Sequence, residues 1–201
     1  MTSPIKRAGI ILGILLAAAG VFFAASIAAP SASMAQEGTP HWIIELKDGT
    51  VDVELLPGVA PQHVARIVEL TEAGFYNGIV FHRVIDGFMA QTGDPTGTGA
   101  GGSELPDVPA EFNSESFTRG AVGAARTQDP NTFNSQFFIC FKDCTFLNGQ
   151  YTVFGRVVAG MEAVDLITRG EPPANPDQII SAKIESEVAV LSDDEQKEFL
   201  E

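Results

Sequence analysis

Three separated segments of the 201-residue chain carry matching sets of aromatic, amide and cationic side chains. The first, FHRVIDGFMAQTGD, runs from Phe81 to Asp94 and contains one arginine, one glutamine, two phenylalanines and a methionine. The others are SQFFI (Ser135 to Ile139) and FLNGQYTVFG (Phe146 to Gly155). An arginine beside apolar side chains suits chemistry in which a fixed positive charge acts where water is excluded. Together the three segments predict one pocket.

The blocks FHRVIDGFM, SQFFI and FLNGxYTVFG, in this order and spacing, resemble the cyclophilin family of peptidyl-prolyl isomerases. The resemblance runs from about Ile43 to Glu187. It implies a mostly β fold, a closed eight-stranded antiparallel barrel with two capping α-helices. It also implies an activity, the cis-trans isomerisation of X-Pro bonds in proteins, which needs no cofactor.

Arg83 is the expected catalytic residue. The obstacle to rotation about an X-Pro bond is amide resonance, with a barrier of roughly 20 kcal/mol, so a catalyst needs only to favour the twisted amide. In that state the prolyl nitrogen is a better hydrogen-bond acceptor, which a permanently charged guanidinium stabilises. Arg83 also matches the family's catalytic arginine. Without the resemblance, a strand arginine is more often a surface residue paired with a carboxylate.

The expected walls of the pocket are apolar side chains, which exclude water and strengthen the effect of the arginine. By resemblance, two glutamines orient the peptide and the arginine, and an alanine contacts the peptide backbone. The predicted substrate-binding residues are Phe88, Met89, Phe138, Phe146 and Leu147 in the walls, Gln91 and Gln136 as the amides, Ala125 and Tyr151.

Two of these residues depart from the best-known eukaryotic pattern of the family. Phe146 stands where many members have tryptophan, and Tyr151 stands where they have histidine, as in bacterial members. Without the indole N–H donor, weak binding of cyclosporin is expected, whereas activity on peptides should persist. The loop after Ala125 is one residue longer than in that pattern, so Arg126 and Thr127 have no one-to-one assignment.

The first 35 residues have the order of an export signal. Lys6 and Arg7 precede an uncharged 22-residue run from Ala8 to Ala29, and small residues continue to Ala35. Because about 20 apolar residues can span a bilayer, cleavage after Ala35 and retention as an inner-membrane anchor both stay open. Either outcome places the rest of the chain in the periplasm or cell envelope.

The pattern of β-prone runs and turns predicts the rest of the domain organisation. Residues 36–41 are a linker, 42–190 form the isomerase-like domain, and 191–201 are an acidic tail. Asp48-Gly49 predicts a hairpin between strands at 41–46 and 51–55. Further strands are expected at 79–85, 88–92, 121–124, 136–140, 153–158 and 179–190, with helices starting at Pro61 and over 161–168. Many short strands and two helices favour a closed antiparallel barrel whose ends the helices cover.

The charge of the chain excludes some partners. With 26 acidic and 12 basic residues the formal net charge is −14, which argues against binding to nucleic acid or anionic lipid. The three histidines, His41, His63 and His82, show no metal-ligand spacing, and Cys140 and Cys144 lack the neighbours of a zinc site, so no metal and free thiols are expected.

Proline-containing polypeptides are the expected partners of a monomeric enzyme. The leading alternative is a binding module that holds proline-containing segments, as a chaperone or scaffold, with negligible turnover. A hydrolase is disfavoured because the sequence has no GxSxG or Cys-His arrangement for a nucleophile.

Overall fold

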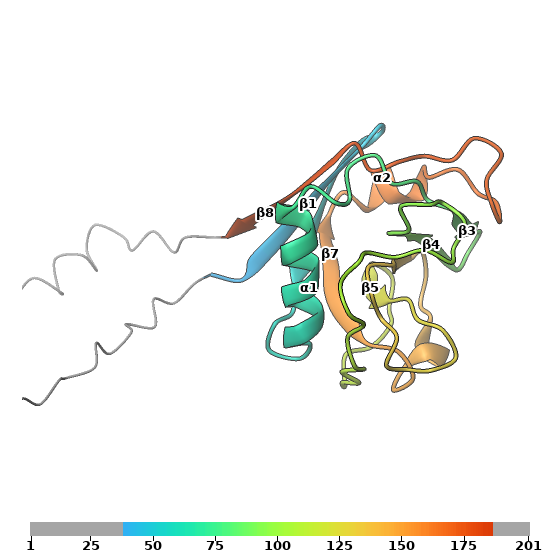
Figure 1. Cartoon of the computed structure of the whole chain (residues 1–201). Coiled ribbons are helices and arrows are strands. Elements are labelled where there is room, and N and C mark those ends of the chain that lie inside the picture. The colour runs from blue at the N-terminus through green and yellow to red at the C-terminus, as the bar shows by residue number, and fades with distance from the viewer. Residues whose placement is uncertain (1–37, 187–201) are drawn as a thin grey trace, which may run out of the picture. The chain divides into compact units, whose positions relative to one another are not determined.

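Eight β-strands form one antiparallel sheet in the computed structural model, which describes residues 38–186 (Figure 1). Their order across the sheet is β3-β4-β6-β5-β7-β2-β1-β8. The strands are β1 (Pro40–Leu46), β2 (Gly49–Leu55), β3 (Arg83–Ile85), β4 (Met89–Thr92), β5 (Ala121–Ala124), β6 (Phe137–Cys140), β7 (Val153–Ala159) and β8 (Ser181–Ser186). Two α-helices, α1 (Pro61–Glu72) and α2 (Met161–Asp165), and a 3-10 helix, η1 (Thr145–Leu147), accompany them.

The sheet curls into a half-barrel and is open, so the prediction of a closed barrel was wrong. The edge strands β3 and β8 do not pair with each other. Between them runs a segment whose Pro172, Pro173 and Pro176 lack the N–H that a ladder needs. Within the part of the chain that the structure describes, only isolated bridges cross this seam, from Val84 to Gly170 and from Val80 to Gln178.

The β1–β2 hairpin shows why the sheet has one buried face. Leu46 pairs with Gly49, which leaves Lys47 and Asp48 as the turn. In β1, Trp42, Ile44 and Leu46 are buried, whereas the intervening residues are more exposed. This period of two places every second side chain in the core.

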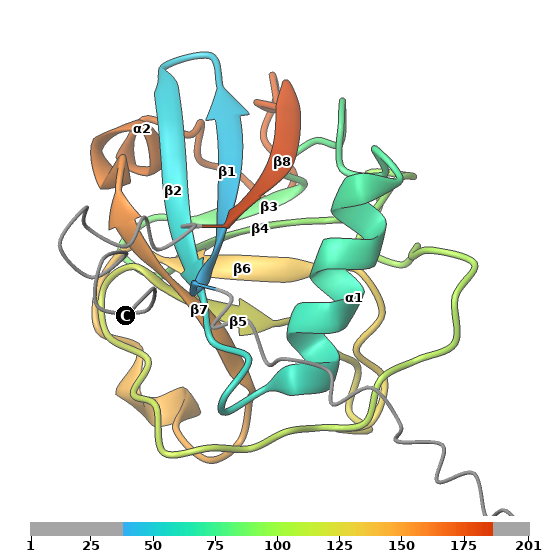
Figure 2. The same cartoon turned by 90° about the vertical axis from the view of Figure 1, so that its left-hand side faces the viewer.

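Both helices lie where the sequence predicts them, but the second helix is shorter than its predicted run. α1 begins at Pro61, runs alongside β7 and β8, and buries Val64, Ile67 and Leu70 (Figure 2). α2 ends at Asp165, three residues earlier than expected. The amides of Leu166 and Ile167 donate to carbonyls three residues back, at 3.2 Å each, so the last turn tightens and the α-helix ends.

Two strands are shorter than their predicted runs by more than one residue. Only Arg83–Ile85 of the run 79–85 joins the sheet, because the amide of Phe81 donates to the carbonyl of Asp177, 2.8 Å away, across the open seam. β8 spans Ser181–Ser186, and residues 187–190 of its predicted run lie outside the described residues.

The core consists of two hydrophobic clusters. The larger one lies between the sheet and α1 and includes Trp42 and Phe137, whose ring centroids are 4.7 Å apart. The smaller cluster contains Met89, Phe117 and Phe138, and Phe88 and Tyr151 pack against it. This smaller cluster supports the surface on which the predicted site residues gather.

The predicted export signal or anchor (1–35) and the acidic tail (191–201) lie outside the described residues. Within residues 38–186, no helix is long and apolar enough to cross a membrane.

Candidate active site

Nine of the ten predicted site residues line one cavity of about 360 Å³. Its lining comes from strands β3, β4 and β6, from the residue after β5, and from the segment around η1. The predicted residues in its lining are Arg83, Phe88, Met89, Gln91, Ala125, Phe138, Phe146, Leu147 and Tyr151. We call this space the proline cavity. Segments that are more than 50 residues apart in the sequence therefore meet at one place, as the three sequence blocks predict.

Arg83 enters the proline cavity from the first position of β3. It pairs in register with Gln91 of β4, so the two side chains are neighbours on one face of the sheet. Its Nε donates to Oε2 of Glu171 at 2.9 Å. Within residues 38–186 neither terminal Nη atom has a hydrogen-bond partner, so two charged donors are available to a ligand.

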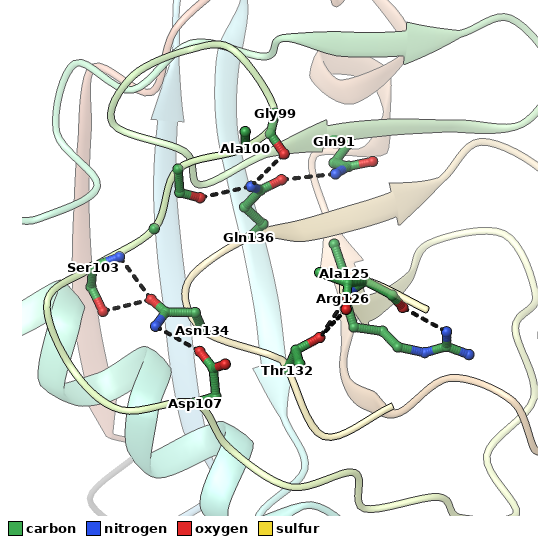
Figure 3. Close-up of a pocket in the computed structure, with 13 residues that line it drawn as sticks. Gln91, Gly99, Ala100, Ser103, Asp107, Ala125, Arg126, Thr132, Asn134 and Gln136 are labelled. Carbon is green, nitrogen blue, oxygen red and sulfur yellow. Dashed lines mark hydrogen bonds between the residues drawn. The ribbon is translucent and has the colours of Figure 1, made fainter. Parts of the chain in front are cut away.

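A chain of amides joins Gln91 to the glycine-rich loop (Figure 3). Nε2 of Gln91 donates to Oε1 of Gln136 at 2.9 Å. Nε2 of Gln136 in turn donates to the carbonyls of Gly99, at 3.0 Å, and Gly101, at 2.8 Å. The contacts fix both amide groups, and Oε1 of Gln91 has no partner among the described residues.

The carboxylate of Asp94 organises this loop. It accepts hydrogen bonds from the amides of Thr96, Thr98, Gly99 and Gly101, at 2.6 to 3.1 Å. Burial alone would raise the pKa of Asp94, but these bonds and that of the Thr96 hydroxyl outweigh burial and lower the pKa well below its ordinary value. Asp94 is therefore ionised at neutral pH and holds the carbonyls that orient Gln136.

The apolar walls of the proline cavity differ in exposure. Met89 and Phe138 are buried, and Phe138 packs against Tyr151 with ring centroids 6.0 Å apart. Phe88 and Phe146 face each other at 5.4 Å. Phe146 is 64% exposed, so it forms the rim of the cavity.

Gln136, the tenth predicted residue, lines a second cavity of about 650 Å³ that shares Gln91, Ala125 and Arg126 with the first (Figure 3). Arg126 was not assigned from the sequence. Its guanidinium lies over the ring of Tyr151, 4.1 Å from the centroid, and donates to the carbonyl of Gln150 at 2.8 Å. No signal in the sequence pointed to this contact, because it depends on how the loop after β5 folds back.

Comparison with known proteins decides the family. The profile of the family described as cyclophilin type peptidyl-prolyl cis-trans isomerase/CLD matches residues 41–184. The chain belongs to this family. A probable peptidyl-prolyl cis-trans isomerase of Brucella suis biovar 1 (strain 1330) is 52% identical over 186 residues, which is 85% of this chain and 95% of the relative. A peptidyl-prolyl cis-trans isomerase of Helicobacter pylori is 40% identical over 136 residues, 66% of this chain and 83% of the relative.

Solved cyclophilin structures share the fold. The crystal structure of cyclophilin AquaCyp293 from Hirschia baltica superposes with a TM-score of 0.66 at 32% identity, covering 71% of this chain and 72% of that one. A Cryptosporidium parvum cyclophilin type isomerase, crystallised in the presence of the dipeptide Ala-Pro, gives 0.68 at 29% identity, covering 72% and 98%. The predicted activity is confirmed: this cyclophilin is a peptidyl-prolyl cis-trans isomerase.

The remaining polar candidates of this cyclophilin are not part of the lining of the proline cavity. His82 is buried and lines, together with Arg83 and Gln91, a neighbouring cavity of about 530 Å³, and its desolvation lowers the pKa of the ring despite the attraction of Asp94. Cys140 and Cys144 are free and buried in the smaller core cluster, and burial raises the pKa of both thiols. Among residues 38–186, no group of three or more His, Cys, Asp and Glu side chains is arranged to hold a metal ion.

Proposed function

We propose that this cyclophilin isomerises X-Pro bonds in exported polypeptides and assists their folding, with Arg83 as its catalytic residue. The observation that carries the proposal is the position of the guanidinium. It lies at the wall of an apolar cavity, with both Nη atoms unpaired among the described residues.

In the proposed mechanism the substrate's proline ring occupies the proline cavity between Phe88, Met89 and Phe138. Rotation about the X-Pro bond removes conjugation from the prolyl nitrogen, whose lone pair then accepts a hydrogen bond from an Nη of Arg83. The planar cis and trans forms offer no such acceptor, so this interaction is stronger in the transition state than in either ground state. The apolar walls exclude water and strengthen it. Oε1 of Gln91 is free to accept from the peptide backbone.

The required stabilisation is moderate. Raising a rate of about 10⁻² s⁻¹ to roughly 10³ s⁻¹ takes about 7 kcal/mol, at about 1.36 kcal/mol for each factor of ten. A charged donor in a dry site, together with substrate orientation, supplies an amount of this order.

The N-terminal sequence supports a location in the cell envelope. Lys6, Arg7 and the apolar run that follows have the order of a signal or an anchor. Substrates would then be proline-containing segments of proteins that fold outside the cytoplasm. The mass of the mature N-terminus, measured after expression in a bacterial host, tests this location.

Replacement of Arg83 tests the role of the guanidinium. We expect Arg83→Ala to lower kcat/KM at least about a hundredfold in a protease-coupled assay with a proline peptide, because it removes the transition-state donor. The circular dichroism spectrum should be unchanged, since the side chain is 41% exposed.

The same experiment separates the enzyme from a binding module. Equal rates for wild type and Arg83→Ala would refute the role of Arg83. Peptide binding without turnover in the wild type would instead support a chaperone or scaffold.

A further inference from the structure

The carboxylate bound to Arg83 lies on the side of the guanidinium that faces away from the proline cavity. Arg83 and Gln91 line both the proline cavity and a separate cavity of about 530 Å³. Glu171 and Pro172 line only the separate cavity. The guanidinium is therefore part of the wall between the two spaces, and Glu171 approaches it from behind.

Strand register places Glu171 next to Arg83. Val84 and Gly170 form an antiparallel bridge in which each amide donates to the other's carbonyl at 2.8 Å. In antiparallel pairing, the residue before Val84 faces the residue after Gly170, and these residues are Arg83 and Glu171. The backbone thus brings the two residues close enough for their side chains to form the hydrogen bond.

The segment that presents Glu171 is itself held in place. The guanidinium of Arg169 stacks on the ring of Phe141, 4.0 Å from the centroid, and donates to the carbonyl of Asp165 at 2.8 Å. A Cβ at Gly170 would lie 2.5 Å from Cα of Pro173, so the chain passes too closely for a side chain. This packing fixes the position from which Glu171 reaches Arg83.

The geometry of the hydrogen bond decides what the carboxylate does. Oε2 of Glu171 accepts a hydrogen bond from Nε alone, at 2.9 Å, so both Nη groups stay unpaired among the described residues. A guanidinium is planar, so the bond at Nε fixes the plane of the group and with it the directions of the Nη N–H groups. These Nη groups belong to a side chain that lines the proline cavity. An arginine on a flexible stem would otherwise lose more conformational freedom when the transition state forms.

We propose that Glu171 is a positioning residue for the isomerase reaction: through its bond to Nε it holds the Arg83 guanidinium so that an Nη donor is directed at the prolyl nitrogen. This inference rests on the proposed catalytic role of Arg83. It concerns the hydrogen bond and not the charge, because a negative charge behind the guanidinium weakens the positive potential in the cavity.

Two substitutions at Glu171 separate the hydrogen bond from the charge. Glu171→Ala removes both, and we expect kcat to fall about five- to twentyfold while the dissociation constant of the peptide changes less than about twofold. Glu171→Gln keeps an acceptor for Nε without the charge, and its kcat should be equal to or above that of the wild type. The measurements are a protease-coupled assay and NMR exchange on the full chain.

A matched control and a double substitution complete the design. Glu115 also pairs with an arginine, Arg156, at 3.2 Å, is 37% exposed and lines none of the three cavities, so Glu115→Ala should leave kcat unchanged. In an Arg83→Lys background, Glu171→Ala should cause no further loss, because lysine has no Nε and Nη fork to orient. Melting temperatures should agree throughout, since exposed ion pairs contribute little to stability.

Each outcome either supports or overturns the inference. Wild-type activity in Glu171→Ala, or a loss in Glu171→Gln as large as that in Glu171→Ala, would overturn it. Failure of the proposed role of Arg83 is distinguishable, because it appears as equal rates for wild type and Arg83→Ala before any Glu171 variant is considered.

Discussion

At the scale of single residues, Arg83 combines the two interpretations that its sequence position allows. A strand arginine is commonly paired with a surface carboxylate, and Arg83 is paired with Glu171 at 2.9 Å. It also lines the proline cavity. Both interpretations are compatible because the carboxylate accepts a hydrogen bond from Nε and leaves the Nη atoms unpaired among the described residues. The ion pair is therefore compatible with catalysis, and the charge of the arginine remains available to a substrate.

The residues of the proline cavity are recognisable in the sequence, but the residues that hold them in place are not. Phe88, Met89 and Gln91 stand in contiguous blocks whose composition is informative by itself. Glu171 lies 88 residues after Arg83 and belongs to no block, and only the bridge between Val84 and Gly170 brings it into contact. Contacts that depend on register across an open seam leave no local signal in a sequence.

We expect Phe146 to be a residue through which binding of a cyclic peptide inhibitor can be changed separately from catalysis. It forms the exposed rim of the proline cavity and lacks the indole N–H that many family members have there. We expect Phe146→Trp to tighten cyclosporin binding about tenfold, equivalent to about 1.4 kcal/mol, because one hydrogen-bond donor is gained. The activity kcat/KM should stay within about threefold, since the position supplies no charge. Isothermal titration calorimetry and the coupled assay measure the two quantities.

The control for this substitution is Phe112→Trp, which adds tryptophan at another exposed position, 48% accessible and outside the proline cavity. Its cyclosporin affinity should match that of the wild type. Equal affinity for Phe146→Trp and wild type would show that the missing indole does not limit binding.

At the scale of elements, strands and helices with a regular hydrophobic period were predictable from sequence, and their ends were less so. The β1–β2 hairpin followed from Asp48-Gly49 between two alternating runs, and α1 from Pro61 and its apolar spacing. η1 was not predicted, because three residues are too few to show a period. The early end of α2 reflects i→i+3 bonds, which a pattern of apolar residues does not encode.

Glu111 caps helix α1 from a distant loop. The N-cap residue, Ala60, has no side chain that can accept a hydrogen bond. Oε2 of Glu111 instead accepts from the amide of His63 at 3.0 Å and from its Nδ1 at 2.7 Å, and both carboxylate oxygens lie 3.1 Å from the amide of Gln62. A carboxylate at the N-terminal end of a helix accepts hydrogen bonds from the free amides and is attracted to the positive end of the helix dipole. The contact ties the loop after β4 to α1.

Removing this cap should destabilise the fold. We expect Glu111→Ala to lower the free energy of unfolding at pH 7 by about 1 to 2 kcal/mol, the usual cost of losing a helix cap. Urea denaturation measures the difference. Glu104→Ala is the control, because this exposed residue of the same loop makes no ion pair or side-chain hydrogen bond within residues 38–186. An unchanged midpoint for Glu111→Ala would show that water replaces the carboxylate without loss.

The same cap makes stability depend on pH. Burial lowers the pKa of His63 against the opposing effect of Glu111, so acidification below about pH 6.5 favours the unfolded chain, which takes up the proton more readily. Burial alone would raise the pKa of Glu111, but bonds from His63 and Gln62 lower it overall. Its stabilisation is present above the unfolded-state pKa and is lost as the pH falls through the folded-state pKa. Below the unfolded-state pKa of Glu111, the stability difference between wild type and Glu111→Ala should therefore shrink as the pH falls further.

At the scale of the whole molecule, the family pattern predicted the number and direction of the strands correctly, but it also predicted a closed barrel, which the structure does not form. Closure requires that β3 and β8 pair over several residues. The chain between Gly170 and Ser181 contains three prolines, and its backbone hydrogen bonds join it to Gly78, Ile79, Phe81 and Val84 on one side and to Glu45 on the other. The open seam places Glu171 beside Arg83, so the departure from a closed barrel contributes to the site.

Location is the remaining property of the whole chain, and its prediction rests on the sequence before the described residues. Lys6 and Arg7 favour the cytoplasmic side, so the run from Ala8 to Ala29 should direct all later residues across the inner membrane. We expect a reporter enzyme that is active only outside the cytoplasm to be active when fused after Glu201, and inactive when Ala8–Ala29 is deleted. A soluble product that begins at Gln36 by mass spectrometry would identify a cleaved signal, and a full-length product in the membrane fraction would identify an anchor. A full-length soluble product with an inactive reporter would contradict export, while leaving the isomerase activity of residues 38–186 intact, because the proline cavity is built from those residues alone.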